Sequence, residues 1–374
     1  MKRLFKRIWK KATALIAAGA VGLTLSMPVM PAPTAAAGTS ETIGTLLTLG
    51  SMAAQISTVR KQVSQLEDTE EGREELFRQY QKEYGVNDDY ALNQKMARIM
   101  TNLSNGVAAI DPTIKDKPYK WFISGDQSVN AFCSFGHVMT VNTGLFNYMP
   151  IEDEIAAVVG HEMGHGQKAH VKKGVMKSIN RSFVLTLGAA AAGGGLAPSL
   201  VASVANIHLN AHSTKKQEWE ADNLSFDYMK NTNYNLGAGA AVMQKFVELE
   251  ASAKKRSGIE KFFNPSDHPN SEARRDNYIK KLEEYSNGHV SMKGNTVTIN
   301  KQFFMSVAET PSMSGPERAC FVLGNLAAAY HNGHAKSQAY LNGNTIMLGS
   351  QPIIELASND EDGQIIVNRL NSIK

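Results

Sequence analysis

One predicted helix restricts the fold of this chain more than any other segment, because it combines both helix-end signals with a fixed arrangement of polar side chains. The helix is expected to begin near Pro150, which three acids and an apolar run follow, and to end near Lys172-Lys173-Gly174. Within it lies the sequence His161-Glu162-Met163-Gly164-His165. Residues four apart lie on the same face of a helix, so both imidazole rings can reach one point beside it. The sequence therefore predicts a helix that presents two histidines to a common site.

This five-residue pattern, HExxH, is typical of zinc sites in which two imidazoles bind the metal. Glu162 would take a proton from water that the metal activates and return it to a leaving amine. The alternative is a pair of histidines on a solvated helix face. A catalytic zinc needs a third protein ligand, and Glu218-Trp219-Glu220-Ala221-Asp222 offers the Glu218 carboxylate on a later predicted helix. One turn farther along the same face, Asp222 can hydrogen-bond a ligand histidine and fix its orientation.

Several motifs in a fixed order resemble those of a known family. They are Asn130-Ala131-Phe132, Gly144-Leu145-Phe146, Glu154 through His165 to His170, Glu218 to Asp222, and His268-Pro269 with Arg274. Over about residues 70–285 this combination resembles peptidase family M48, the Ste24-type and Oma-type gluzincin zinc metallopeptidases. The resemblance implies one Zn²⁺ ion per chain, held by His161, His165 and Glu218. Glu162 would then be the general base, and Asp222 would hydrogen-bond a ligand histidine.

The resemblance also implies roles for residues around the cleft. The strand with Asn130-Ala131-Phe132 borders the cleft, where an extended peptide can pair as an added strand. His268 would be a displaceable fourth ligand, and Arg274 would stabilise the oxyanion or support the site; the alternative for both is loop structure. The family's usual Pro-Gly-Gly turn is replaced here by Cys133-Ser134-Phe135-Gly136-His137. This departure indicates an altered turn, or else a narrowed substrate groove or a His137 that reaches the metal.

Hydrophobic periodicity predicts an α+β fold that is mainly helical. A small sheet is expected beside the HExxH helix in a zincin-like catalytic domain, with strands near residues 119–123, 129–132 and 138–141. Later helices are expected at residues 218–230, 237–255 and 272–285.

The composition changes after residue 288. Two strand-like runs at 294–299 and 343–348 flank a predicted helix at 317–330, and another helix can close the chain. The expected domains are a metallopeptidase domain at 38–288, with N-terminal helices in 38–110 and the catalytic core in 111–288, and a small α+β domain of unknown role at 289–374.

The N-terminal segment indicates export. Six of the 39 basic residues lie among the first eleven, and residues 1–37 contain no acid. An apolar stretch and a small-residue tract follow, as in a signal peptide cleaved near residue 37; the alternative is an uncleaved anchor helix. The remaining chain carries slightly more acids than bases, so nucleic acid is not an expected partner. We expect a soluble, exported bacterial protein, periplasmic or secreted, with membrane association as a further option.

Two features have two interpretations each. Residues 182–214 contain no charged side chain and are split by glycines, which indicates a hairpin of two apolar helices. This hairpin either packs on the catalytic helix or contacts a membrane surface through residues 182–207. The two cysteines, Cys133 and Cys320, either form a disulfide or are two buried thiols.

These observations together predict a zinc endopeptidase of the cell envelope. Its expected substrates are extended or unfolded proteins and peptides, and its expected role is envelope protein quality control. The alternative is a chaperone-like envelope assembly factor whose metal site is closed or structural. The complete HExxH pattern favours the enzyme, because a scaffold would have no need of Glu162.

Overall fold

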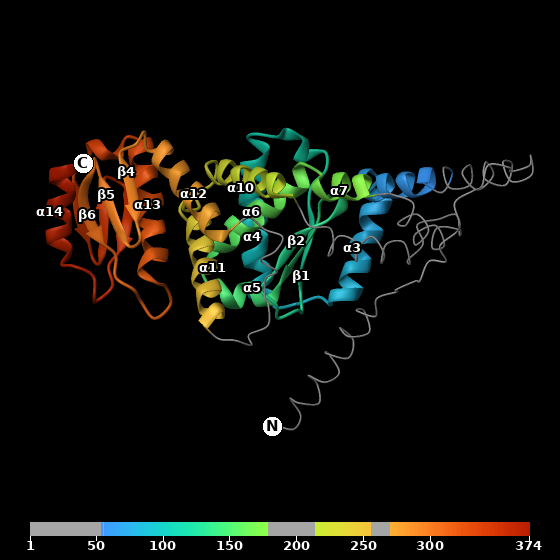
Figure 1. Ribbon diagram of the computed structural model, residues 1–374, viewed down its shortest axis with the longest axis horizontal. Coiled ribbons are helices and arrows are strands. Elements are labelled where there is room, and N and C mark those ends of the chain that lie inside the picture. The colour runs from blue at the N-terminus through green and yellow to red at the C-terminus, as the bar shows by residue number, and fades with distance from the viewer. Residues whose placement is uncertain (1–53, 55, 179–213, 256–269) are drawn as a thin grey trace, which may run out of the picture. The chain divides into compact units, whose positions relative to one another are not determined.

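The computed structural model of the chain describes residues 54, 56–178, 214–255 and 270–374 (Figure 1). These residues belong to one compact unit, and the first of its helices covers residues 56–68. The predicted signal peptide at 1–37, residues 182–213 of the predicted apolar hairpin at 182–214, and His268 lie outside the described residues. Within the described ranges, no helix is long and apolar enough to cross a membrane.

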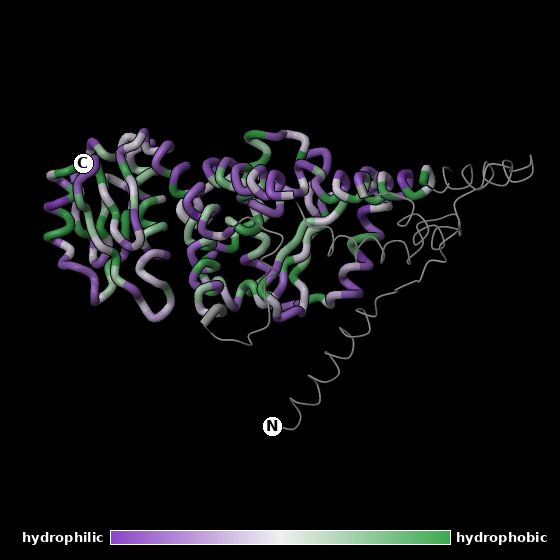
Figure 2. The backbone as a smooth tube through the Cα atoms, in the orientation of Figure 1, coloured by the Kyte–Doolittle hydropathy of each residue, from purple (hydrophilic) through white to green (hydrophobic). Residues whose placement is uncertain are grey.

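A three-stranded sheet forms one wall of the catalytic region. Its strands are β1 (Lys120–Ser124), β2 (Ala131–Cys133) and β3 (Val138–Asn142). The order is β1-β3-β2, with β3 parallel to β1 and antiparallel to β2. Each strand lies within two residues of its predicted position, because apolar runs bounded by turns specify strands well. Figure 2 shows the hydrophobic character of these strands.

Helices cover both faces of this sheet, because successive side chains of a strand point to opposite faces. Phe122 and Phe132 pack in a small core with side chains of α3 (Glu70–Tyr84). Ile123 and Ala131 belong to the main core, to which α4 (Tyr90–Ala108) contributes. The described residues also form four short helices, which are η1 (Pro112–Lys115), η2 (Phe135–His137), α5 (Thr143–Tyr148) and η3 (His334–Lys336).

The prediction of one continuous helix from Pro150 to Lys172 is wrong at its C-terminal end. Helix α6 spans Glu152–Gln167, and a separate helix, α7, spans His170–Ser178. Between them Ala169 has a φ of 47°, a left-handed backbone conformation that a helix cannot continue through. Glycines in the last turns of α6 weaken its hydrogen-bonded ladder, which favours an early end. The predicted end signals Lys172-Lys173-Gly174 therefore lie inside α7.

Three helices complete the catalytic region close to their predicted positions: α10 (Lys215–Met229), α11 (Ala238–Lys255) and α12 (Ser271–Tyr285). A capping box of Thr214 and Gln217 satisfies backbone groups at the start of α10. Helix α10 packs closely on α6 at two glycines. A Cβ atom on Gly160 would lie 2.9 Å from Ser225 Oγ, and one on Gly164 would lie 3.0 Å from Ala221 Cα. Only glycine permits this approach, which brings the ligand candidates of α6 and α10 together.

The C-terminal region repeats one unit of three strands and a helix. The first unit contains β4 (Val290–Lys293), β5 (Thr296–Ile299), β6 (Gln302–Ser306) and α13 (Gly315–His331). The second contains β7 (Ala339–Asn342), β8 (Thr345–Leu348), β9 (Gln351–Glu355) and α14 (Gly363–Ile373). Each unit is an antiparallel meander, and the irregularities at Val297/Thr298 and Ile346/Met347 fall at matching positions. We call these units the C-terminal repeats.

The predicted strands of this region correspond to β5 and β8, the central strands of the two meanders. The four outer strands were not predicted. Their pairing with the central strands, rather than local alternation alone, specifies them. The proposed domain boundary at residue 288 stays a prediction.

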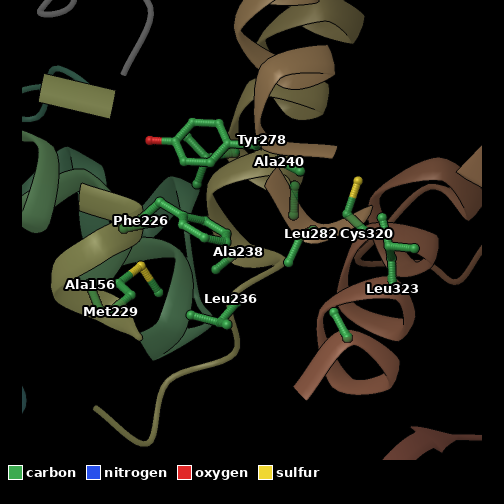
Figure 3. Close-up of a cluster of buried hydrophobic side chains, with 14 of the residues drawn as sticks. Ala156, Phe226, Met229, Leu236, Ala238, Ala240, Tyr278, Leu282, Cys320 and Leu323 are labelled. Atoms are coloured by element: carbon green, nitrogen blue, oxygen red, sulfur yellow. The ribbon is translucent and has the colours of Figure 1, made fainter. Parts of the chain in front are cut away.

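The main core is continuous from α6 to α13. Figure 3 shows Ala156 of α6, Phe226 and Met229 of α10, and Leu282 of α12 in the same cluster as Cys320 and Leu323 of α13. Cys133 and Cys320 are both buried and free, so the second interpretation, two buried thiols, describes them. Burial raises the pKa of both thiols.

Candidate active site

Three side chains of the predicted zinc site converge on one point. The Nε2 atoms of His161 and His165 lie 3.1 Å apart, and they lie 3.5 Å from Oε2 and Oε1 of Glu218, respectively. A tetrahedral zinc ion with bonds of about 2.0–2.1 Å keeps its ligand atoms about 3.3 Å from one another. One ligand atom from each of the three side chains lies within 4.8 Å of the others, so small side-chain adjustments would let the group hold a zinc ion.

Asp222 and Arg274 orient the first of these histidines. Asp222 Oδ1 accepts a hydrogen bond of 2.9 Å from His161 Nδ1, which leaves Nε2 directed at the other ligand candidates. Arg274 donates to both carboxylate oxygens of Asp222, at 2.7 and 2.6 Å, and the Tyr278 hydroxyl donates to Oδ1 at 3.2 Å. Asp222 is fully buried, so these partners replace its lost hydration. The ring of His161 is thus held in one orientation.

Burial and neighbouring charges shift the pKa values of the two histidines in opposite directions. Burial alone would lower the pKa of His161, but its hydrogen bonds to Asp222 and Glu218 raise it to about 9. Burial, reinforced by a positive charge on His161, lowers the pKa of His165 well below its usual range. Burial would raise the pKa of Asp222, yet Arg274 brings it down to about 2. Asp222 therefore stays ionised beside His161 and keeps its hydrogen bond to the ring.

Glu162 lies beside His161 along a cavity of about 540 Å³. Its carboxylate accepts a hydrogen bond of 3.0 Å from the backbone N–H of Cys133, at the end of β2. Much of the remaining cavity lining is apolar and comes from one face of α11, with Val242, Met243, Phe246 and Val247. The cavity can therefore take an apolar group next to the carboxylate and the histidines.

The predicted substrate strand only partly faces this cavity. Asn130 and Ala131 line it, whereas Phe132 points to the opposite face of the sheet and packs against Tyr80 and Tyr84. Among the described strands β2 pairs with β3, and the backbone N–H of its last residue, Cys133, reaches the Glu162 carboxylate.

The remaining predicted residues have clear positions. His137 does not join the metal-ligand group: its Nδ1 lies 2.7 Å from the Lys117 carbonyl oxygen, and its ring stacks on Tyr119. Burial lowers the pKa of His137 to about 4. The segment 133–137 is thus an altered turn, with Gly136 at a φ of 63°. Arg274 is bound to carboxylates, which favours support of the site over direct contact with an oxyanion.

Two residues without a predicted role also lie at the site. His170 Nδ1 is 3.0 Å from His165 Nδ1, and His170 Nε2 is 3.2 Å from a carboxylate oxygen of Glu220. A continuous helix would direct His170 away from His165, so helical periodicity gave no indication of this contact. The sequence contained one indication of their importance: His170 ends one of the motifs that resemble the family, and Glu220 lies in the middle of another.

Comparison with known families agrees with this geometry. The family model described as Peptidase family M48 matches residues 92–285, just over half of the chain, and this range includes all three ligand candidates. The chain belongs to peptidase family M48. M48 metalloproteases depend on zinc, and the donor set of this member fits that ion.

Several curated relatives are proteases or metalloproteases by name. Metalloprotease LoiP of Escherichia coli (strain K12) is 30% identical over 160 residues, which cover 42% of this chain and 62% of LoiP. Mitochondrial metalloendopeptidase OMA1 of Arabidopsis thaliana is 29% identical over 133 residues, 33% of this chain and 25% of OMA1. Beta-barrel assembly-enhancing protease of Escherichia coli (strain K12) is 24% identical over 206 residues, 52% of this chain and 39% of that protein. The chain thus matches less than two thirds of the length of these relatives.

Proposed function

We propose that this M48 metalloprotease is a zinc-dependent endopeptidase of the cell envelope that cleaves extended or unfolded protein segments. The observation that carries the proposal is the convergence of His161, His165 and Glu218, together with Glu162, which lines the same cavity as His161. Export rests on the predicted signal peptide at residues 1–37. The similarity to a protein named for β-barrel assembly supports a role in envelope protein quality control.

His161, His165 and Glu218 would hold the zinc ion, which supplies Lewis-acid polarisation of the scissile carbonyl and activation of water. Glu162 accepts a proton and delivers it to the leaving amine. The Cys133 N–H holds the Glu162 carboxylate in place before the reaction. The ion pair of Asp222 with Arg274 keeps the His161 ring oriented throughout.

The cavity-side edge of β2, beside Asn130 and Ala131, would pair with an extended substrate. A peptide that pairs with this edge gains backbone hydrogen bonds that do not depend on its sequence. The same peptide can place an apolar side chain in the cavity lined by α11. A folded segment cannot pair with this edge, because its backbone groups already form hydrogen bonds within its own structure.

The test compares the full-length chain with its Glu162→Gln variant, with zinc added and unfolded casein as substrate. We expect cleavage to fall about 10²–10⁴-fold, since general acid–base catalysis contributes about that much, while zinc content stays the same. Glu284→Gln, an exposed change on α12, serves as the control and should cleave normally. Equal cleavage by Glu162→Gln would contradict the mechanism, and no cleavage by any of the three would favour the chaperone-like alternative. Recovery of the chain only from the cytoplasm would contradict export.

A further inference from the structure

His170 is a buried histidine beside the ligand candidates that the mechanism above does not use. It is 4% exposed, and both of its ring nitrogens have partners. Nδ1 faces the Nδ1 atom of His165 at 3.0 Å, and Nε2 faces the Glu220 carboxylate at 3.2 Å. Three groups, one each from α10, α7 and α6, therefore form a line of contacts that runs from Glu220 through His170 to His165.

The break between α6 and α7 makes this line possible. On one continuous helix, residues 165 and 170 would point about 140° apart, since each residue turns the helix by about 100°. The left-handed backbone at Ala169 redirects the chain, so that the ring at the first position of α7 returns to His165. A non-glycine residue in this conformation has a conformational cost of about 1 kcal/mol or more, which the surrounding contacts must offset.

The chemistry of imidazole fixes the direction of the hydrogen bonds. A neutral imidazole that offers the Nε2 lone pair to a metal carries its proton on Nδ1. His165 would then donate from Nδ1 to the Nδ1 atom of His170, which must accept. The proton of His170 therefore lies on Nε2 and is donated to Glu220.

We propose that His170, held by Glu220, is a positioning residue that fixes the tautomer and ring orientation of His165 for metal binding. The inference rests on the proposed zinc site. It gives His165 a support equivalent to the one that Asp222 gives His161, but through a second imidazole instead of a direct carboxylate. Partners of this kind change metal affinity without touching the metal.

Two substitutions of similar size distinguish the contributions of the two ring nitrogens of His170 to zinc binding. His170→Asn keeps a polar atom near the Nδ1 position, which contacts His165, whereas His170→Gln keeps one near the Nε2 position, which contacts Glu220. We expect His170→Gln to weaken zinc binding about 10–100-fold and His170→Asn to stay within about threefold of the parent chain. Glu220→Gln leaves an acceptor in place and should weaken zinc binding less than tenfold.

The measurement is competition of the full chain with a chromophoric chelator for zinc, together with the visible absorption of the cobalt-substituted protein, which reports ligand geometry. Thermal unfolding of each metal-free variant is recorded first. The control is His331→Asn, because His331 of α13 also has a stacked ring, which lies on Tyr285 of α12. Equal affinities for the Asn and Gln variants, or a weaker Asn variant, would overturn the inference. Failure of the parent chain to bind zinc would instead overturn the proposed function.

Discussion

Two buried arginine–aspartate pairs lie in different regions of the molecule and are alike in geometry. Beside the metal-ligand candidates, Arg274 donates to the two carboxylate oxygens of Asp222 at 2.7 and 2.6 Å. In the C-terminal repeats, Arg318 donates to the two carboxylate oxygens of Asp360 at 3.1 and 2.7 Å. Both aspartate side chains are 0% exposed. The pairs themselves therefore give no indication of which one serves catalysis.

The difference lies in what else each pair binds. Asp222 also accepts hydrogen bonds from the side chains of His161 and Tyr278. Asp360 instead accepts from backbone N–H groups, those of Ala308 and Ala357. One pair thus fixes the ring of a ligand candidate, and the other joins loops of the two C-terminal repeats. The same arginine–aspartate pair can therefore support a site or stabilise a fold, depending on which other groups donate hydrogen bonds to the aspartate.

The largest expected effect is on the stability of the protein. It tests whether the two pairs contribute equally to the free energy of unfolding. Asp222→Ala and Asp360→Ala each leave a buried arginine without its carboxylate, so we expect each to lower the free energy of unfolding by about 3–5 kcal/mol. Urea unfolding of the metal-free chain measures both values. A cost below about 1 kcal/mol for either variant would show that the two pairs are not equivalent in this respect.

The next effect is pH dependence in acid. Burial would raise the pKa of both aspartates, but the paired arginine lowers it, to about 2 for Asp222. A lowered pKa stabilises the folded state above the ordinary value near 3.9, and this contribution is lost as the pH falls from about 4 towards 2. We expect the contribution of Asp222 to the free energy of unfolding to fall by about 2 kcal/mol over that range. Unfolding of metal-free parent and Asp222→Asn chains at several pH values should give a shallower slope for the variant, and identical slopes would contradict this account.

The third effect separates the two pairs by function. Asp222→Asn should weaken zinc binding about 10–100-fold, because it removes the charge that orients His161 and supports its ligand atom. Asp360→Asn should leave zinc binding unchanged, since none of its partners belongs to the site. Chelator competition measures both. A comparable loss of zinc affinity in the two variants would mean that the C-terminal repeats and the metal site are coupled.

The HExxH helix shows which structural features local sequence patterns predict and which they do not. The spacing of His161 and His165 and the acids at the helix start predicted the helix and its shared face, because these depend on local periodicity alone. The end near Lys172 was wrong, because the chain breaks earlier, at the left-handed Ala169, and Lys172, Lys173 and Gly174 lie inside the separate helix α7. The left-handed Ala169 depends on contacts that His170 makes in space, which no local pattern records.

The ExxxD segment shows a similar division. Glu218 and Asp222 were predicted to act together because residues four apart share a helix face, and both lie with the histidines. Glu220, between them, turns to a partner on α7 that helical spacing could not place beside it. In the C-terminal repeats, β5 and β8 were predicted from their β-branched residues, whereas the outer strands depend on pairing with them.

The contact of α6 with α10 has a consequence for the motif as a pattern. The third and fourth positions of HExxH are written as unrestricted, yet the fourth is Gly164, where a Cβ atom would lie only 3.0 Å from Ala221 Cα. Ala221 directly precedes Asp222 and follows Glu218 by three residues, so an alanine at position 164 would require this part of α10 to move by a few tenths of an ångström. The distance between the third ligand candidate and the two histidines therefore depends on a residue that is not itself a ligand candidate.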